Sequence, residues 1–177
     1  GVKTAIFCKF NPDDVKLEER FEGVDADLYW TYSESTCSIQ NQYFTADKER
    51  RQCTSLGVCD PFLFDEFPKV DTDVYHFAGL VYGDFDGLLL EQAARKGKVA
   101  LDVQCMLRHV EKDGTMGFHD WKEKRQYLPL IQYLKTDAAE AEILTGLTDR
   151  AAAAKLLYQW GAKEVVITHN TEVLAYD

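Results

Sequence analysis

The chain has 177 residues, of which 46% are hydrophobic, so it is long enough for about one domain with a real core and is neither disordered nor fibrous. Its 20 Lys and Arg residues against 30 Asp and Glu residues give a net charge of −10, which argues against nucleic acid and an anionic membrane as main partners. No apolar run approaches the roughly 20 residues that span a bilayer, and the N-terminal apolar stretch is too short for a signal peptide.

The first part of the chain predicts strands and a hairpin. Residues 2–10 read as a strand that ends at an Asn-Pro-Asp turn signal, and residues 26–32 read as a second strand. Residues 35–56 contain two β-prone arms around the charged turn TADKER, which predicts a β-hairpin. Because both arms are rich in polar residues, we expect this hairpin to project from the core, as a lid or a dimer surface.

From about residue 73 the pattern changes to alternating strands and helices. Strands are predicted at 74–81, 98–103, 165–168 and 174–176, with a short strand that ends at 134–135. Helices are predicted at 85–97, with Phe85, Leu88, Leu89 and Ala93 on one face, at 122–133 with a kink or break at Pro129, after Asp137, and at 149–160. A small hairpin is expected within 111–121. This alternation predicts an α/β fold with a mostly parallel sheet.

In sheets of this kind, ligands bind outside the carboxyl ends of the strands. That rule selects three positions in this chain: after Val103, after Lys135 and after Thr168. No internal repeat and no second core are evident in the sequence. We therefore expect a single domain over residues 1–177, with 35–56 as a projecting hairpin lid.

Cysteine and histidine spacing gives no sign of a metal site. The five cysteines are Cys8, Cys37, Cys53, Cys59 and Cys105, and no C-x-x-C pair occurs among them. None of the four histidines has a metal-binding neighbour at i+3 or i+4. The pattern predicts reduced, mostly buried thiols in a cytoplasmic protein.

The segment KTDAAEAEILTG (135–146) admits two interpretations. In the first, Asp137 caps a helix, Glu140 completes a capping box and Gly146 ends the helix in the left-handed conformation. In the second, the same helix start offers free N–H groups and a positive dipole end to phosphate, and a nearby carboxylate holds Mg²⁺ directly or through water. The chain has neither G-x-x-x-x-G-K nor G-x-G-x-x-G, so a nucleotide would have to be held in another way.

Several segments resemble one family. LKTDAAEAEILTG is similar to the K-x-N-x-x-E-x-x-x-L-T/S-G segment of the ribokinase-like (PfkB) carbohydrate kinases. The downstream run AAAAKLLYQWGAKEVVIT, a loop and EVLAYD is similar too, and ALDVQCMLR resembles the D-x-N-x-x-R region of the family. The resemblance covers nearly the whole chain and is strongest over 134–177. It implies a Rossmann-like three-layer α/β/α fold with ATP and Mg²⁺ as cofactors.

On the donor side, the resemblance implies roles for two loops. Glu140 matches the Glu that helps to hold Mg²⁺, usually through water. Asp137 replaces an Asn that contacts phosphate; its carboxylate cannot donate a hydrogen bond, although it could add a metal ligand. Where the family has T-x-G-x-x-G, this chain reads THNTEV. Thr168, Asn170 and Thr171 are therefore expected to line the nucleotide side, with Asn170 in place of the first glycine.

On the acceptor side, Asp102, Gln104 and Arg108 match the region near the substrate and the phosphates. Asp102 and Gln104 are expected to bind substrate. Arg108 is expected to act in catalysis, because its guanidinium could neutralise charge on the transferring phosphoryl group. The alternative for Arg108 is a surface salt bridge. The hairpin at 35–56 stands where the family has its lid, which covers the sugar and often forms a homodimer.

The implied function is ATP- and Mg²⁺-dependent phosphoryl transfer to a hydroxyl of a sugar or related small molecule. The catalytic base of the family belongs to a G-A-G-D motif that would follow EVLAYD, and it is absent from these 177 residues. The chain is thus expected to be the central part of a longer kinase, with the base outside it. The Asp at 137 and the glycine-poor loop leave an alternative open, a non-catalytic nucleotide- or sugar-binding or regulatory relative. An unrelated Rossmann-like protein would need a Gly-rich turn after the first strand, which residues 1–14 lack.

Overall fold

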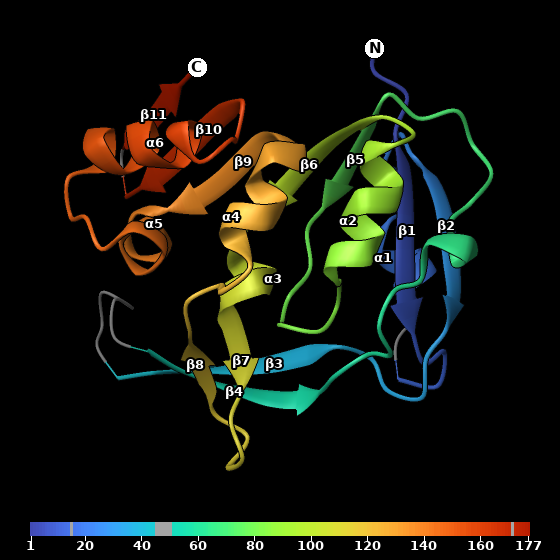
Figure 1. The fold of residues 1–177 in the computed structure, drawn as a ribbon. Coiled ribbons are helices and arrows are strands. Elements are labelled where there is room, and N and C mark those ends of the chain that lie inside the picture. The colour runs from blue at the N-terminus through green and yellow to red at the C-terminus, as the bar shows by residue number, and fades with distance from the viewer. Residues whose placement is uncertain (15, 45–50, 171) are drawn as a thin grey trace. The chain divides into compact units, whose positions relative to one another are not determined.

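The computed structural model describes residues 1–14, 16–44, 51–170 and 172–177. These residues form two compact units (Figure 1): Gly1–Val70 with Val110–Met116, and Asp71–His109 with Gly117–Asp177. The expectation of one domain with 35–56 as its lid stays a prediction. No helix within the described ranges is long and apolar enough to cross a bilayer.

The first unit begins with a parallel pair of strands. β1 (Ala5–Phe10) and β2 (Asp27–Tyr32) pair in register from Ala5↔Asp27 to Phe10↔Tyr32, and α1 (Leu17–Arg20) lies between them in the sequence. Phe7 packs edge-on against Phe62 and Phe67, with ring centroids 5.6 and 5.2 Å apart. Both strands form within the ranges predicted for them, which extend one to three residues further at the N-terminal end.

A β-hairpin follows in the same unit. β3 (Ser38–Tyr43) pairs antiparallel with β4 (Arg51–Gly57), and Ser38↔Gly57 and Tyr43↔Arg51 are the outermost pairs. The predicted hairpin is therefore confirmed, while its turn TADKER falls outside the described residues. A 3-10 helix, η1 (Phe64–Glu66), closes this part of the chain, and Glu66 Oε2 lies 2.8 Å from Nζ of the buried Lys9.

The second unit contains a five-stranded sheet. Its strand order is β11-β10-β9-β6-β5, in which β11 alone is antiparallel to its neighbour (Figure 1). The strands are β5 (Val74–Phe77), β6 (Lys98–Asp102), β9 (Ile131–Asp137), β10 (Glu164–His169) and β11 (Glu172–Tyr176). The helices are α2 (Gly87–Ala94), α3 (Gln104–Leu107), α4 (Lys124–Tyr127), the 3-10 helix η2 (Leu128–Leu130), α5 (Ala138–Thr145) and α6 (Arg150–Gln159). The α/β class with a mostly parallel sheet is confirmed.

A short β-ribbon is inserted between β6 and β9. It consists of β7 (Arg108–Val110) and β8 (Met116–Phe118), so the hairpin predicted within 111–121 starts earlier than expected. The core of the second unit is built from aliphatic side chains of strands and helices that are at most 1% exposed: Leu89, Leu90, Val99, Leu101, Leu134, Leu157, Val165 and Ile167. Strands buried on both faces explain the continuous apolar runs in the sequence.

Two helix predictions need correction. Phe85 precedes α2, and Leu88 is 58% exposed, because the helix starts at the cap Asp86 and buries Leu89 and Leu90 instead. The helix predicted at 122–133 is limited to α4 and η2, and the chain enters β9 at residue 131. Pro129 cannot supply a backbone N–H to a helix, and pairing with β6 and β10 then favours a strand.

The prediction of mostly buried thiols is wrong. Only Cys105 is buried, whereas Cys8, Cys37, Cys53 and Cys59 are half-buried. All four belong to the first unit, whose described strands β1 to β4 form two-stranded sheets rather than one larger sheet.

Two helix-ending glycines in the second unit differ in what surrounds them. Gly161 follows α6 with a φ of +121°, and a Cβ built there would lie 2.7 to 2.9 Å from Pro129. Gly146 follows α5 with a φ of +74° and has open space. Gly161→Ala should therefore lower the free energy of unfolding by about 3 kcal/mol, against about 1 kcal/mol for Gly146→Ala. Urea titration of both variants measures this, and equal losses would show that contact with Pro129 is unimportant.

Candidate active site at the carboxyl edge of the sheet

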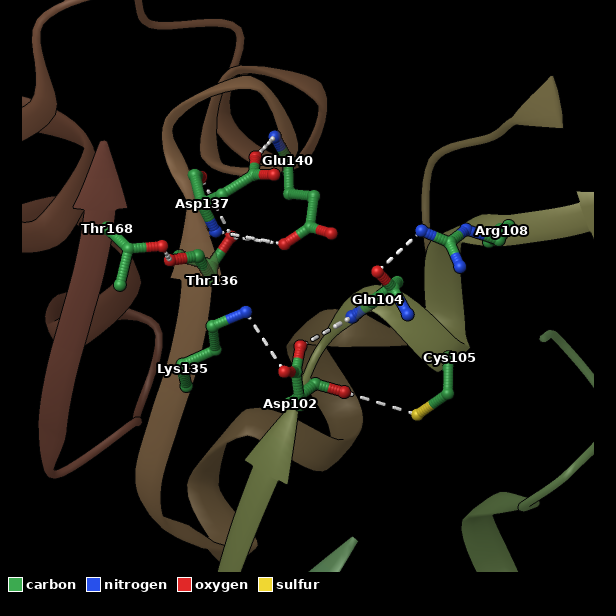
Figure 2. Close-up of polar contacts among 9 residues, drawn as sticks. All are labelled: Asp102, Gln104, Cys105, Arg108, Lys135, Thr136, Asp137, Glu140 and Thr168. Atoms are coloured by element: carbon green, nitrogen blue, oxygen red, sulfur yellow. Dashed lines mark hydrogen bonds and ion pairs between the residues drawn. The ribbon is translucent and has the colours of Figure 1, made fainter. Parts of the chain in front are cut away.

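The three positions selected from the sequence share one edge of the sheet. β6, β9 and β10 are parallel neighbours, and they end at Asp102, Asp137 and His169. Asp102 is in register with Lys135, and Asp137 with Thr168. Side chains that lie far apart in the sequence therefore meet at this edge (Figure 2).

The start of α5 is a complete capping box. Asp137 Oδ1 accepts a hydrogen bond from the Glu140 N–H at 2.8 Å, and Glu140 Oε2 accepts one from the Asp137 N–H at 2.9 Å. Gly146 ends the helix with φ of +74°. The capping interpretation is thus confirmed residue by residue. It does not exclude the second interpretation, because the same cap points Asp137 and Glu140 to the edge where ligands bind in such sheets.

Glu140 is a buried carboxyl group, 3% exposed, at this edge. Burial raises its pKa, and the neighbouring charges of Asp137 and Asp102 raise it further, although the Asp137 N–H and the Lys135 ammonium act in the opposite direction. Oε2 also lies 3.4 Å from the Thr136 hydroxyl. The other carboxylate oxygen points away from these donors, toward the side where Gln104 and Arg108 lie (Figure 2). A cation at that oxygen would favour the ionised form.

Lys135 on β9 forms an ion pair with Asp102 at the end of β6. Its Nζ lies 2.9 Å from Asp102 Oδ2, and its side chain is 41% exposed. Burial alone would lower its pKa, but the hydrogen bond and charge of Asp102, with the charges of Glu140 and Asp137, raise it overall. Lys135 therefore carries a firmly held positive charge among three carboxylates. Sequence reasoning assigned no role to Lys135 or to Thr136; the Lys of the quoted K-x-N-x-x-E pattern was the available signal.

Arg108 follows α3 and is buried, with 6% of its surface exposed. Its Nη2 donates to Gln104 Oε1 at 2.5 Å, and its guanidinium lies over the Phe118 ring at 5.5 Å. Its Nε is buried and has no hydrogen-bond partner in the described part of the chain. The alternative of a surface salt bridge is wrong, since the side chain is inside. A buried donor without a partner is a costly arrangement that an incoming anion would relieve.

Hydrogen bonds link Gln104 and Asp102 to Arg108. The Gln104 N–H donates to Asp102 Oδ1 at 3.3 Å, and the Gln104 side chain accepts from Arg108. One carboxylate thus faces both Lys135 and the start of α3 (Figure 2). The two residues predicted to bind substrate and the one predicted to act in catalysis form a single hydrogen-bonded chain.

Comparison with known proteins gives a consistent result. No protein-family model matches the chain, and no curated protein matches it. Among solved structures, a sulfate complex of a pyrophosphate-dependent kinase in the ribokinase family superposes with a TM-score of 0.92 at 28% identity, over 100% of this chain and 63% of that one. A complex of such a kinase with a pyrophosphate analog and myo-inositol gives 0.90 and 28%, over 100% and 62%. Ribokinase from Thermotoga maritima gives 0.62 and 13%, over 100% and 57%.

This chain has the ribokinase fold. Its structural neighbours are ribokinase-family kinases, which confirms the resemblance drawn from the sequence. The ribokinase-like chain spans less than two thirds of the length of these neighbours, namely 63%, 62% and 57%.

A hollow of about 600 Å³ lies beside the start of α5 in the ribokinase-like chain. It is lined by the end of β9, the start of α5, the end of β10, the turn that follows and the start of β11: Asp137, Ala138, Ala139, Thr168, His169, Asn170, Glu172 and Val173. Asn170 takes the turn with a φ of +25°, as expected of an Asn in place of a glycine. Three of the residues predicted to bind the donor, Asp137, Thr168 and Asn170, therefore line one hollow. Glu140 is not among its lining residues, and Thr171 is outside the described residues.

A second hollow of about 500 Å³ lies at the opposite edge of the sheet. Lys98 and Ile131, which begin β6 and β9, line it together with Gly97 and Pro129. It contains none of the predicted site residues. Because ligands of parallel sheets bind at the carboxyl ends, we assign the site of the ribokinase-like chain to the edge with Asp102 and Asp137.

The carboxylates fit a Mg²⁺ ion that keeps most of its water. Within the described ranges, no group of three or more His, Cys, Asp or Glu side chains is placed to hold a metal directly. Mg²⁺ is commonly bound through one or two carboxylates, several waters and substrate phosphates. Glu140, with a disfavoured negative charge and one oxygen turned toward the edge, suits that role, and Asp137 is its neighbour. The metal-binding role of Glu140 stays a prediction.

Proposed function

We propose that the protein containing this ribokinase-like chain transfers a phosphoryl group to a hydroxyl of a sugar-like small molecule, with Mg²⁺. The proposal rests on the groups that meet at the carboxyl edge of the sheet. A helix start, a buried carboxylate, a lysine and a buried arginine meet there in the fold of ribokinase-family kinases. Phosphoryl transfer depends chiefly on positioning and on charge stabilisation, which are the two things this edge supplies.

The donor end of the proposed site is the hollow beside α5. The first N–H groups of α5, at Ala138 and Ala139, have no partners inside the helix and are available to phosphate oxygens. Thr168 and Asn170 line the same hollow. Glu140, which shares the capping box with Asp137, would hold Mg²⁺ through water, and the ion would offset the charge of the phosphates. Without a cation, the two carboxylates that line the hollow, Asp137 and Glu172, would repel a polyphosphate.

The acceptor end lies along Asp102, Gln104 and Arg108. Asp102 and Gln104 offer oxygen and amide groups to hydroxyls of the acceptor. Arg108 is positioned to stabilise charge on the transferring group, since its buried Nε has hydrogen-bonding capacity to spare. Lys135 connects the two ends by holding Asp102. The base that accepts the proton of the acceptor hydroxyl would lie outside these 177 residues.

The donor is ATP by family resemblance, and pyrophosphate is a second candidate. One observation favours pyrophosphate. The structures that superpose at 0.92 and 0.90 are described as pyrophosphate-dependent. A pyrophosphate donor needs the helix start and the metal but no pocket for a base or ribose.

Direct assay of the whole protein tests the proposal. Sugars and cyclic polyols would be offered with ATP or with pyrophosphate, and phosphorylated product would be measured with and without EDTA. We expect product with one donor only, and none after chelation. If neither donor gives product while calorimetry shows binding of a sugar or nucleotide, the non-catalytic alternative is correct.

Asp137→Asn separates two roles of this side chain. Asn is as good a helix cap as Asp, so folding should be unaffected. Removal of one negative charge beside the donor phosphates should lower the KM for the donor about fivefold, which corresponds to roughly 1 kcal/mol. Steady-state kinetics at saturating Mg²⁺ measures it. A higher KM that extra Mg²⁺ restores would show instead that Asp137 holds the metal.

A further inference from the structure

Two cysteines of the first unit flank the neck of the β3–β4 hairpin. Cys37 directly precedes β3, and Cys59 follows β4 after one intervening residue. The pair Ser38↔Gly57 is the last rung of the ladder beside them. The Cys37 N–H donates a hydrogen bond to Cys59 Sγ at 2.9 Å. Residues that are distant in sequence thus place a sulfur against the backbone of a second cysteine.

Cys37 and Cys59 are close enough to form a disulfide. Because an N–Cα bond measures about 1.46 Å, the Cys59 sulfur lies no more than about 4.4 Å from the Cα of Cys37. The Cys37 sulfur sits one Cβ beyond that Cα, so a side-chain rotation that turns it toward Cys59 brings the two sulfurs close to each other. Both side chains are half-buried and are not joined in this structure. Soluble oxidants can therefore reach them.

Two backbone contacts hold the Cys59 sulfur in place: it accepts a hydrogen bond from the Cys37 N–H at 2.9 Å, and its thiol donates to the Lys9 carbonyl oxygen at 3.5 Å. The first contact persists when the thiol loses its proton, so the Cys59 thiolate, which is the reactive form, keeps a hydrogen-bond donor. Cys8 is near enough to interact electrostatically with Cys59, but burial, with the charge of Cys59 as a smaller contribution, raises its pKa and so disfavours its thiolate. Cys53 lies on β4, where its thiol donates to Asn41 Oδ1 at 2.9 Å. Cys37 is therefore the partner best placed for Cys59.

We propose that Cys37 and Cys59 are a thiol modification site that forms a reversible disulfide across the neck of the hairpin on exposure to oxidised glutathione. The Cys59 thiolate attacks one sulfur of oxidised glutathione, which forms a mixed disulfide and releases one glutathione thiolate. The Cys37 thiolate then attacks Cys59 Sγ and releases the second. The protein loses two hydrogens, and the two electrons and two protons leave as two molecules of glutathione.

The modification has a structural consequence that does not depend on the proposed activity. In the reduced chain, the two arms of the hairpin are held at this end by non-covalent contacts, which include the strand pairing and the hydrogen bond from the Cys37 N–H to Cys59 Sγ. A covalent link between the residues that flank β3 and β4 suppresses opening of the arms from the neck. Hydrogen exchange of the β3 and β4 amides should become about tenfold slower, because openings that separate the arms are then blocked.

Peptide mapping of the whole protein tests the site. After treatment with oxidised glutathione and alkylation, wild type should give a peptide pair linked through Cys37 and Cys59 that dithiothreitol releases. Cys37→Ser should instead retain glutathione on Cys59. Cys53→Ser, a matched change on the same hairpin, should form the link as wild type does. A Cys8–Cys59 link, or lasting glutathione on wild-type Cys59, would overturn the proposal. Because the readout is a covalent bond, a failed kinase assay leaves this result unaffected.

Discussion

Glu140→Gln should lower the turnover of the whole protein about 100-fold without disturbing the fold. Gln also completes a capping box at the third helical position, so its carbonyl oxygen can accept the Asp137 N–H as Glu140 Oε2 does at 2.9 Å. The substitution removes the negative charge that would hold hydrated Mg²⁺, and losses of 10- to 100-fold are typical when such an outer metal contact is removed. The metal role and the capping role are thereby separated in one variant.

The measurement is turnover as a function of Mg²⁺ concentration. Glu140→Gln should require more Mg²⁺ and remain slow at saturation. Glu142→Gln is the matched control, because Glu142 is an exposed residue of the same helix. Unchanged turnover in Glu140→Gln would show that Glu140 is a helix cap and nothing more.

The pH dependence of protein stability gives an independent test of the burial of the Glu140 carboxyl group. Burial raises its pKa above the ordinary value of 4.5, so the folded metal-free protein holds this proton more tightly than the unfolded chain does. The resulting contribution to stability is complete below pH 4.5 and is lost as pH rises through the folded pKa. At neutral pH, Glu140→Gln should therefore be at least as stable as wild type, and its stability should depend less on pH above 4.5. Urea titrations across this pH range measure the difference.

Arg108→Met should lower turnover by roughly 100- to 1000-fold while stability changes by less than about 1 kcal/mol. The guanidinium is buried and one of its donors has no partner, so its charge is costly in the folded state. Met fills similar space without that cost. If Arg108 served stability alone, Arg108→Met would unfold more easily than wild type. Its turnover would then recover on cooling, because more of the protein would be folded.

Comparison with a surface arginine sharpens this test. Arg95 lies at the end of α2 with its side chain 74% exposed, and it forms an ion pair with Glu91 at 3.7 Å. Arg95→Met should change turnover less than twofold, because exposed pairs of this kind contribute little. If Arg108→Met and Arg95→Met have the same turnover, Arg108 takes no part in the reaction.

Several features of this protein were determined by the sequence over short distances. The cap at Asp137, its reciprocal contact with Glu140 and the left-handed Gly146 are all as predicted. The parallel sheet also followed from alternating strand and helix patterns. Its strands were predicted to end at residues 103, 135 and 168, and they end at residues 102, 137 and 169. These features rest on contacts between residues a few positions apart, or on the rule that a strand–helix–strand unit returns parallel. A single sequence carries that information.

Other features were decided only by the tertiary structure. β9 begins at Ile131 where a helix was predicted, because β6 and β10 hydrogen-bond to that segment from both sides. Arg108 is buried against Gln104 and Phe118 rather than exposed, and Lys135 pairs with Asp102 on another strand. Cys37 and Cys59 meet across the neck of a hairpin. Each of these depends on which distant segments pack together. Local propensity is too weak to decide that packing, because burial and strand pairing outweigh it.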